Sequence, residues 1–445
     1  MSGEVVKATD KKYNLHSWSA QGSLNPLVIE KSEGIYFWDS NGKKYYDMSA
    51  QLVNMNLGHQ HKKIVEAIKA QADKMCYMGP GFAVDVRSEL ARKIIEEVAP
   101  PNMGKVFFTL AGAEANENAI KIAKMFTGRH KIFSRYRSYH GATYGSANLT
   151  GEPRRFPSEP GIPGFVKFFD PYIYREPVIK FASEEEASAY YLAKLEEQII
   201  YEGRDKVAAI FLESVTGSNG VIIPPKGYLK GVRELCTKYG ILMVCDEVMA
   251  GWGRTGEWFA FMNWGIEPDI ITFAKGITCG YAPLGGVIIS KKIAEHFDKN
   301  VLYCGLTYSA HPLGCAAGIA AIDVYKQEKI FDHVKEMGKV MAKRLAALRA
   351  AHDTVGECRS IGLFGMVEFV KNSKTDEPLV AYGQDPQGVM KQIMGKLAEN
   401  GFWTYTHENM VAVSPPLIIT EAELNQAFDI LDKVAGWVDA TFGEK

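Results

Sequence analysis

The sequence has no excess of charge of either sign and no long hydrophobic run. Its 51 lysines and arginines balance 52 aspartates and glutamates, so nothing indicates a basic surface for nucleic acid or for an anionic membrane. No stretch approaches the roughly 18 apolar residues of a membrane span, and the polar N-terminus has no apolar signal-peptide core. These absences favour a soluble, cytoplasmic protein that acts on small molecules.

Cysteine is scarce, and so are the common catalytic motifs. The seven cysteines are odd in number and form no C-x-x-C pair, which disfavours a disulfide framework or a zinc site and indicates reduced thiols. A G-x-G-x-x-G match at 251–256 is followed by Gly265 and Pro268. A nicotinamide-binding fingerprint instead requires an immediate helix and an acidic residue about twenty positions further on. Dinucleotide binding is therefore disfavoured.

The central part of the chain alternates apolar runs with segments of helical periodicity. The expected helices span 114–126, 190–201 and 229–239, and the expected strands span 106–109, 131–134, 208–213, 241–246, 270–274 and 286–290. Continuous apolar runs of this kind are buried on both faces, and helices between them connect parallel strands. We predict an α/β fold with a mainly parallel sheet between helices.

Both ends of the chain have a different pattern. Residues 34–48 predict a hairpin with its turn at Asn41-Gly42, and helices are expected at 62–72 and 89–98. Towards the C-terminus we expect helices at 313–327, 333–351, 388–400 and from 421, with a strand at 362–369. We predict an N-terminal segment, 1–60, a large domain, 61–325, and a C-terminal domain, 326–445. The hairpin and the C-terminal part would form a smaller α+β domain.

A single lysine follows the apolar strand expected at 270–274. Burial lowers the pKa of a lysine, and the free amine is the nucleophile in Schiff-base formation, so Lys275 is a candidate for covalent carbonyl chemistry. Taken alone, a lysine at the end of a strand more often reaches solvent. The residues at the ends of the neighbouring strands decide whether Lys275 is a catalytic lysine or a solvent-exposed one.

Two further segments supply complementary groups at strand ends. Asp246 ends an apolar run at the edge where open α/β sheets bind ligands, and its carboxylate could hold a pyridinium nitrogen such as that of pyridoxal phosphate (PLP). The alternative role is a helix cap or turn. Gly112 and Ala113 begin a helix after a strand, where backbone N–H groups bind phosphate; the alternative is an ordinary tight turn.

An aromatic residue and a histidine follow the strand expected at 131–134. Tyr139 could stack on a planar cofactor, although a tyrosine at such a position is more often part of the core. His140 beside it is more often a hydrogen-bonded structural residue than a catalytic one.

Taken in order, these segments resemble the class III (ω-amino acid) aminotransferases from about residue 25 to residue 435. The most specific blocks are 245–248, 253–256, 268–270 and 274–276. The resemblance implies fold type I, the architecture of a PLP-dependent transferase with a seven-stranded type of sheet. It also implies that Lys275 carries PLP as a Schiff base, that Asp246 holds the pyridine nitrogen, and that Val248 and Tyr139 enclose the ring.

The same resemblance assigns the phosphate and the subunit contacts. Gly112 and Ala113 would bind the phosphate, with His140 and Glu213 also in the cofactor site. Residues 305–312 are similar to the segment whose threonine reaches the phosphate of the neighbouring subunit, so Thr307 implies a homodimer with shared active sites, with a tetramer left open. Members usually have Ser where this chain has Ala111, so one hydroxyl donor to the phosphate is absent.

Within the family, four segments resemble the taurine:2-oxoglutarate aminotransferase group: 17–20, 51–54, 149–155 and 405–409. Tyr405 and Ala412 stand where relatives place a carboxylate-binding arginine, which leaves Glu213 without its usual partner. Arg154 or Arg155 is the hypothesis for the replacement, with Trp18 and Val53 in the pocket wall; the alternative is that both arginines form surface ion pairs.

We therefore predict a PLP-dependent aminotransferase that moves an amino group from an ω-amino acid or amino sulfonate, best taurine, to a 2-keto acid, best 2-oxoglutarate, by a ping-pong mechanism. The alternatives are other donors, such as β-alanine, GABA or diamines, with pyruvate as acceptor, or a decarboxylase or aminomutase of the same fold. A non-catalytic binding protein is disfavoured because Lys275 and Asp246 are both present.

Overall fold

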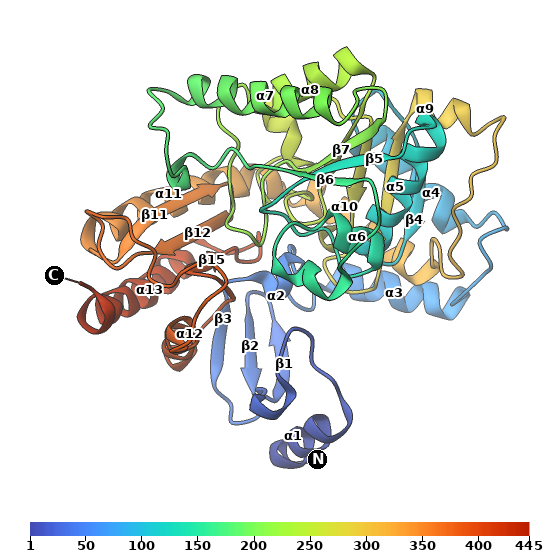
Figure 1. Cartoon of the computed structure of the whole chain (residues 1–445). Coiled ribbons are helices and arrows are strands. Elements are labelled where there is room, and N and C mark those ends of the chain that lie inside the picture. The colour runs from blue at the N-terminus through green and yellow to red at the C-terminus, as the bar shows by residue number, and fades with distance from the viewer. Residues whose placement is uncertain (445) are drawn as a thin grey trace.

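The computed structural model describes residues 1–444, and Lys445, the last residue of the predicted C-terminal domain, lies outside the described residues. The described chain forms three sheets, of which the central one has seven strands in the order β4-β10-β9-β8-β7-β5-β6. In Figure 1 this sheet lies in the upper half of the molecule, with α7 and α8 above it. The prediction of an α/β fold is confirmed.

The central sheet is parallel except for one strand. Strand β10 runs antiparallel to both β4 and β9, whereas β6, β5, β7, β8 and β9 pair in parallel. The strands are β4 (Met103–Thr109), β5 (Lys131–Arg135), β6 (Phe165–Phe168), β7 (Val207–Glu213), β8 (Leu242–Asp246), β9 (Ile270–Phe273) and β10 (Gly285–Ser290). Strand β6 was not predicted, because this edge strand has only four residues, three of them half-buried.

The helices expected between these strands are present. They are α5 (Gly112–Thr127), α7 (Glu184–Tyr201) and α8 (Tyr228–Tyr239). Helix α7 begins six residues before the predicted start, at Glu184. Ser183 caps it by accepting the N–H of Glu186, and three glutamates in its first turn complement the helix dipole.

The two ends of the chain meet in a second sheet of four strands, β1-β2-β3-β13. The predicted hairpin consists of β2 (Tyr36–Asp39) and β3 (Lys44–Asp47), with Tyr36 opposite Tyr46 and their ring centroids 5.0 Å apart. Strand β1 (Ile29–Glu33) extends the hairpin on one side, and β13 (Phe402–Trp403), from near the C-terminus, pairs in parallel with β3 on the other.

A third sheet, in the order β11-β12-β15-β14, lies beside the central one (Figure 1). Its strands are β11 (Val355–Ile361), β12 (Phe364–Phe369), β14 (Thr406–His407) and β15 (Met410–Val413). The strand predicted at 362–369 is β12. Strand β11 was not predicted because its sequence, VGECRSI, is mostly polar and small.

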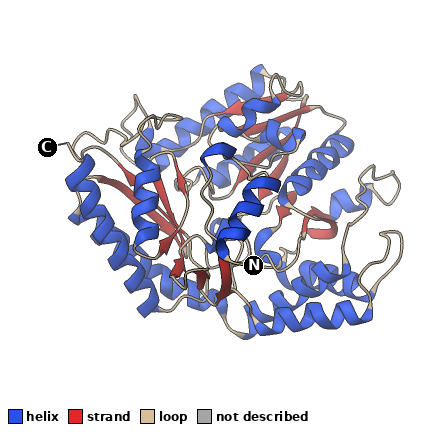
Figure 2. Ribbon diagram, turned by 90° about the horizontal axis from the view of Figure 1, so that it is seen from below, coloured by secondary structure: helices blue, strands red, loops and turns tan. Residues whose placement is uncertain are grey.

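Helices surround the sheets on the outside (Figure 2). The longer ones are α1 (Gly3–Tyr13), α3 (Lys62–Lys74), α4 (Asp85–Lys93), α10 (Pro312–Gln327), α11 (Ile330–Ala351), α12 (Val389–Glu399) and α13 (Glu421–Phe442). The short ones are α2 (Ala50–Val53), α6 (Tyr144–Leu149) and α9 (Lys291–His296). The helix expected at 89–98 begins earlier, as α4, and ends in a π-helical turn over Ile94–Val98. No helix within residues 1–444 is both long and apolar enough to cross a membrane.

The register of the central sheet brings three strand ends to one edge. Glu213, the last residue of β7, lies opposite Asp246, the last residue of β8, and Asp246 lies opposite Thr272 of β9. Lys275 follows β9 by two residues. The carboxyl ends of parallel strands are the usual place for ligands in such sheets, so the fold gathers the predicted site residues at its expected site.

Candidate active site

A cavity of about 570 Å³ lies at this edge of the central sheet. Its lining comes from strand ends, from the start of α5 and from loops of the flanking sheets. The lining residues include Trp18, Leu52, Gly112, Ala113, Asn116, Tyr139, His140, Glu152, Arg154, Glu213, Ser218, Asp246, Val248, Met249, Lys275, Tyr405 and His407. Most of the predicted site residues therefore surround one cavity.

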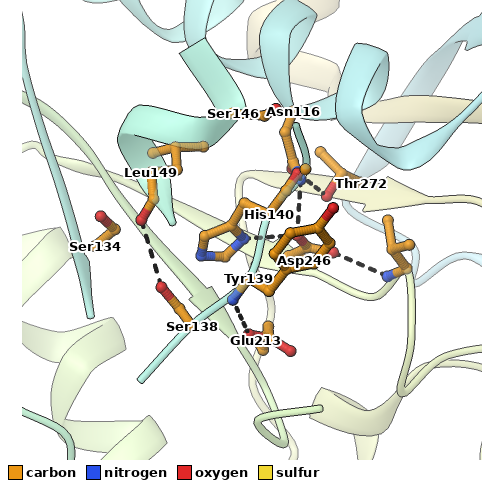
Figure 3. Close-up of polar contacts among 12 residues, drawn as sticks. Asn116, Ser134, Ser138, Tyr139, His140, Ser146, Leu149, Glu213, Asp246 and Thr272 are labelled. Atoms are coloured by element: carbon orange, nitrogen blue, oxygen red, sulfur yellow. Dashed lines mark hydrogen bonds and ion pairs between the residues drawn. The ribbon is translucent and has the colours of Figure 1, made fainter. Parts of the chain in front are cut away.

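Asp246 is the most firmly held acidic group in the cavity (Figure 3). Its Oδ2 accepts hydrogen bonds from Asn116 Nδ2 at 2.8 Å and from His140 Nδ1 at 2.7 Å, and its Oδ1 accepts the backbone N–H of Val248 at 3.0 Å. Asn116 is itself fixed, since its Oδ1 accepts the hydroxyl of Thr272 at 2.9 Å. These bonds hold the carboxylate in one orientation at the floor of the cavity.

Lys275 supplies the only amine side chain in the cavity lining. Its backbone has φ of 50°, a conformation that a non-glycine residue seldom adopts. Its side-chain amine makes no hydrogen bond or ion pair with any residue in the range 1–444. Burial lowers its pKa to about 8, and Arg154 and Arg254 act in the same direction, whereas Asp246 and Glu213 oppose the shift. The lysine is therefore a far better nucleophile near neutral pH than an ordinary lysine.

The N-terminus of α5 offers an anion site on another side of the cavity. Ala111 is the N-cap, and no side chain caps the helix, so the first N–H groups face the cavity without a side-chain acceptor. A Cβ added at Gly112 would lie 2.8 Å from Val248 Cγ1. Only glycine allows the helix start and Val248 to come so close.

Tyr139 and Val248 form two walls of the cavity. The guanidinium carbon of Arg154 lies 3.8 Å from the centroid of the Tyr139 ring and 5.4 Å from that of Trp18. The rings of Trp18 and Tyr139 meet edge to face, with centroids 6.3 Å apart. Burial raises the pKa of Tyr139, so its hydroxyl stays protonated.

Arg154 is the arginine that lines this cavity. Its Nε pairs with the carboxylate of the buried Glu152, and its Nη2 donates to Ser218 Oγ at 3.0 Å. Its Nη1 has no hydrogen-bond partner in the described chain. The guanidinium is thus oriented by two groups, and one of its nitrogens, Nη1, remains available to a ligand.

Arg155 points elsewhere. Its Nη1 donates to the carbonyl of Gly151, its Nε lies 3.1 Å from Glu159 Oε1, and it faces a neighbouring cavity. The structure thus separates the two arginines that the sequence could not distinguish.

Two other predicted residues also lie away from this cavity. Val53 is buried in a small apolar cluster, and its neighbour Leu52 takes the place in the wall that was expected for Val53. Thr307 lies on an exposed loop, where its carbonyl accepts the hydroxyl of Tyr77 at 2.7 Å.

Tyr405 and His407 extend the wall from β14 and the residue before it. Burial, together with the nearby Arg154 and Arg137, lowers the pKa of His407 to about 4, so this imidazole is neutral at pH 7. At Tyr405, where the resemblance predicts a carboxylate-binding arginine, the structure thus has a phenol, and the neutral His407 follows two residues later. Ala412 lies in the buried strand β15.

Several lining residues were not predicted. Asn116 could have been found, because positions 112, 113 and 116 lie on one face of a helix. Ser218 and Met249 lie in irregular segments, and no sequence pattern indicates that they reach the cavity.

The groups around the cavity match the chemistry of PLP. The N-terminus of α5, which requires glycine at position 112, can bind the phosphate. The fixed carboxylate of Asp246 can pair with the pyridine nitrogen, and the amine of Lys275, with its lowered pKa, can react with the aldehyde. Tyr139 and Val248 provide the flat aromatic and aliphatic walls that a planar ring requires.

Comparison with known proteins agrees with this arrangement. The family model for class III aminotransferases matches residues 18–435. The chain is 32% identical to taurine–pyruvate aminotransferase of Bilophila wadsworthia, covering 98% of each chain. It is 35% identical to putrescine–pyruvate aminotransferase of Pseudomonas aeruginosa, covering 96% of this chain and 95% of the relative.

A solved structure is more similar still. The taurine:2-oxoglutarate aminotransferase from Bifidobacterium kashiwanohense, in complex with PLP and glutamate, superimposes with a TM-score of 0.97 at 50% identity over 99% of both chains. Together with the family match, this similarity shows that the protein belongs to the class III aminotransferases, the fold type I transferases that use PLP.

Proposed function

We propose that this aminotransferase takes the amino group of taurine, or of a similar ω-amino sulfonate, and passes it to 2-oxoglutarate in a ping-pong reaction. The observation that carries the proposal is the position of Arg154. Its guanidinium lines the same cavity as Lys275, is close enough to lower the pKa of that lysine, and has a free Nη1.

The surroundings of Arg154 suit an anion with several oxygens. A guanidinium donates in a planar fork, and Ser218 lies within hydrogen-bond distance beside it, so two or three oxygens of one group could be bound together. Glu152 balances the charge of the arginine while no anion is bound. The ring of Trp18 also lines the cavity, 5.4 Å from the guanidinium carbon of Arg154, and in this proposal it is the wall that favours a short donor such as taurine.

The similar proteins support both halves of the reaction. The Bilophila relative is a taurine–pyruvate aminotransferase, and the Bifidobacterium structure is a taurine:2-oxoglutarate aminotransferase in complex with PLP and glutamate. Glutamate is the product that amination of 2-oxoglutarate would give. The 50% identity to the second protein favours 2-oxoglutarate as acceptor.

The roles of the side chains follow from their geometry. Bound PLP would supply the electron sink that stabilises a carbanion at the donor carbon. Asp246, held by Asn116 and His140, would keep the pyridine nitrogen protonated. Lys275 would hold the cofactor and, once released by the donor, would move a proton as a neutral base. Gly112 and Ala113 would bind the phosphate, and Arg154 would orient the substrate anion.

We further propose a homodimer in which Thr307 of one subunit completes the phosphate site of the other. Large exposed aromatic side chains near Thr307 support a subunit contact there: Tyr77, Phe82, Tyr303 and Tyr308. The seven free cysteines support a location in the reducing cytoplasm.

The second candidate is a pyruvate-dependent enzyme with another donor. This candidate is favoured by two relatives, a taurine–pyruvate aminotransferase and a putrescine–pyruvate aminotransferase. A fixed Arg154 argues against putrescine, because a dication has no anion for the guanidinium to bind. A decarboxylase or aminomutase would turn over without any keto acid, so keto-acid dependence separates these alternatives.

The two neighbouring arginines provide a matched test. Arg154→Met should lower kcat/KM for taurine by about 100-fold, the loss of two charged hydrogen bonds, while an amine of equal length without an anionic group should be little affected. Arg155→Met should leave both substrates nearly unchanged. If Arg154→Met affects both amines equally, or if Arg155→Met is the variant that discriminates, the proposed anion site is wrong.

A further inference from the structure

Glu213 is a buried carboxylate whose two oxygens accept backbone N–H groups from two separate segments. Its Oε1 accepts the N–H of Tyr139 at 3.1 Å, and its Oε2 accepts the N–H of Gly217 at 2.6 Å. Only 4% of the residue is exposed. No arginine forms an ion pair with this carboxylate within residues 1–444. Arg135 donates to the main-chain carbonyl of Glu213, and its guanidinium pairs with Asp170.

The two segments carry different parts of the site. Residues 138–141 carry Tyr139, which lines the cavity. Figure 3 shows the hydrogen bond that the backbone N–H of Tyr139 donates to Glu213. The loop that starts at Gly217 carries Ser218, which accepts from Arg154. A Cβ added at Gly217 would lie 2.2 Å from Met249 Sδ and 3.0 Å from Glu213 Oε2. The loop therefore packs tightly on the carboxylate and on the cavity wall.

We propose that Glu213 is a positioning residue that fixes the cofactor wall and the substrate-anion site relative to each other. For the anion site, this inference rests on the proposed role of Arg154. Through Tyr139 the carboxylate sets the aromatic wall, and through Gly217 and Ser218 it sets the orientation of the guanidinium. One side chain thereby links the two binding functions of the cavity.

The residue type follows from this geometry. A carboxylate is an acceptor at both oxygens, whereas an amide has one acceptor and one N–H₂ donor. Glutamine at position 213 has the same shape, but its amide must point a donor at one of two backbone N–H groups. That N–H would be left buried and unpaired, and its segment would move.

The test compares Glu213→Gln with Asp39→Asn. Asp39 is the control for loss of a buried carboxylate in the N-terminal hairpin, outside the cavity: its Oδ1 accepts the backbone N–H groups of Asn41 at 2.9 Å and Lys43 at 3.0 Å, and its Oδ2 accepts the hydroxyl of Tyr45 at 3.1 Å. Three quantities are measured for each variant: the Tm, the Kd for PLP, and the preference for taurine over an amine of equal length without an anion.

The expected result for Glu213→Gln is a roughly tenfold change in the Kd for PLP, in the preference for taurine, or in both, depending on which N–H is lost. Asp39→Asn should change only the Tm. In an Arg154→Met background, Glu213→Gln should not change the preference further, because it acts through that arginine. A variant whose Tm falls while its Kd and preference stay at the parent values would overturn the inference.

Two controls separate the possible failures. If the parent enzyme has no preference for taurine, the proposed function fails, and the Kd for PLP still tests the link to Tyr139. If Glu213→Gln does not fold, Ser218→Ala tests the other link and should lower the preference without changing the Kd for PLP. An unchanged preference in Ser218→Ala would then contradict the role of the loop.

Discussion

His140 Nδ1 lies 2.7 Å from Asp246 Oδ2, and both side chains are almost completely buried. Because the carboxylate oxygen is an acceptor, the histidine ring carries a proton on Nδ1. His140 also lines the cavity. The histidine that the sequence suggested to be structural thus supports the group proposed to hold the pyridine nitrogen.

Replacing Asp246 tests this role. Asp246→Asn keeps the shape but removes the charge, and its amide N–H₂ would face the donor of His140, of Asn116 or of Val248. We expect the rate of the reaction with the amino donor to fall by at least 100-fold, measured as the absorbance change of bound PLP in single-turnover experiments. A variant within a few-fold of the parent rate would show that the carboxylate is not needed.

A glycine substitution tests the phosphate site. Gly112→Ala would place a Cβ 2.8 Å from Val248 Cγ1, so the start of α5 or Val248 must move. We expect the Kd for PLP to rise by about tenfold or more, the equivalent of one lost charged hydrogen bond. Gly395→Ala, in α12 with no atom within 4 Å of the added Cβ, is the control and should bind PLP normally. Equal Kd values for both variants would place the phosphate elsewhere.

The lowered pKa of Lys275 predicts how the apoenzyme captures PLP. Only the neutral amine attacks the aldehyde, and its pKa is about 8 instead of the ordinary 10.5. The rate of covalent PLP incorporation should therefore rise with pH below about 8 and level off above it. Stopped-flow absorbance at a series of pH values measures this profile. A rate that still rises steeply between pH 9 and 10 would show that the lysine is not perturbed.

Arg254, in the glycine-rich segment 251–256, has a structural role. Its fully buried guanidinium donates to the carbonyls of Leu363 and Pro415 and to Asn56 Oδ1. Arg254→Met would leave these acceptors unpaired and should lower the free energy of unfolding by about 3 kcal/mol, seen as a lower Tm. Arg344→Met, at an exposed pair with Asp429, should cost less than about 1 kcal/mol. Similar Tm values for the two variants would contradict this role.

The parts of the site that could be predicted are those encoded by local sequence. Asp246 and Lys275 follow apolar runs that are buried on both faces, and Gly112 and Ala113 begin a helix after such a run, so strand ends and a helix start were enough to place them. The central sheet followed from the same runs. The edge strand β6 could not be predicted in this way, because an edge strand needs no continuous apolar run.

The remaining residues depend on contacts between distant segments. Arg154 and Arg155 are adjacent in a 3-10 helix. Glu152 and Ser218, which lies in another loop, orient Arg154, whereas Gly151 and Glu159 orient Arg155. Leu52 replaces Val53 in the cavity wall because Ala50, Gln51 and Val53 have positive φ values of 44°, 61° and 56°. Irregular backbone of this kind has no periodicity from which side-chain directions can be inferred.

The most direct test of the proposed function separates the two half-reactions. Taurine is added to the PLP-loaded enzyme without any keto acid, and the absorbance of the bound cofactor is recorded; 2-oxoglutarate is added afterwards. We predict that taurine converts the cofactor to its amine form and that 2-oxoglutarate restores the original spectrum. A spectrum that taurine leaves unchanged, while β-alanine or a diamine converts it, would contradict the assignment of taurine as the donor.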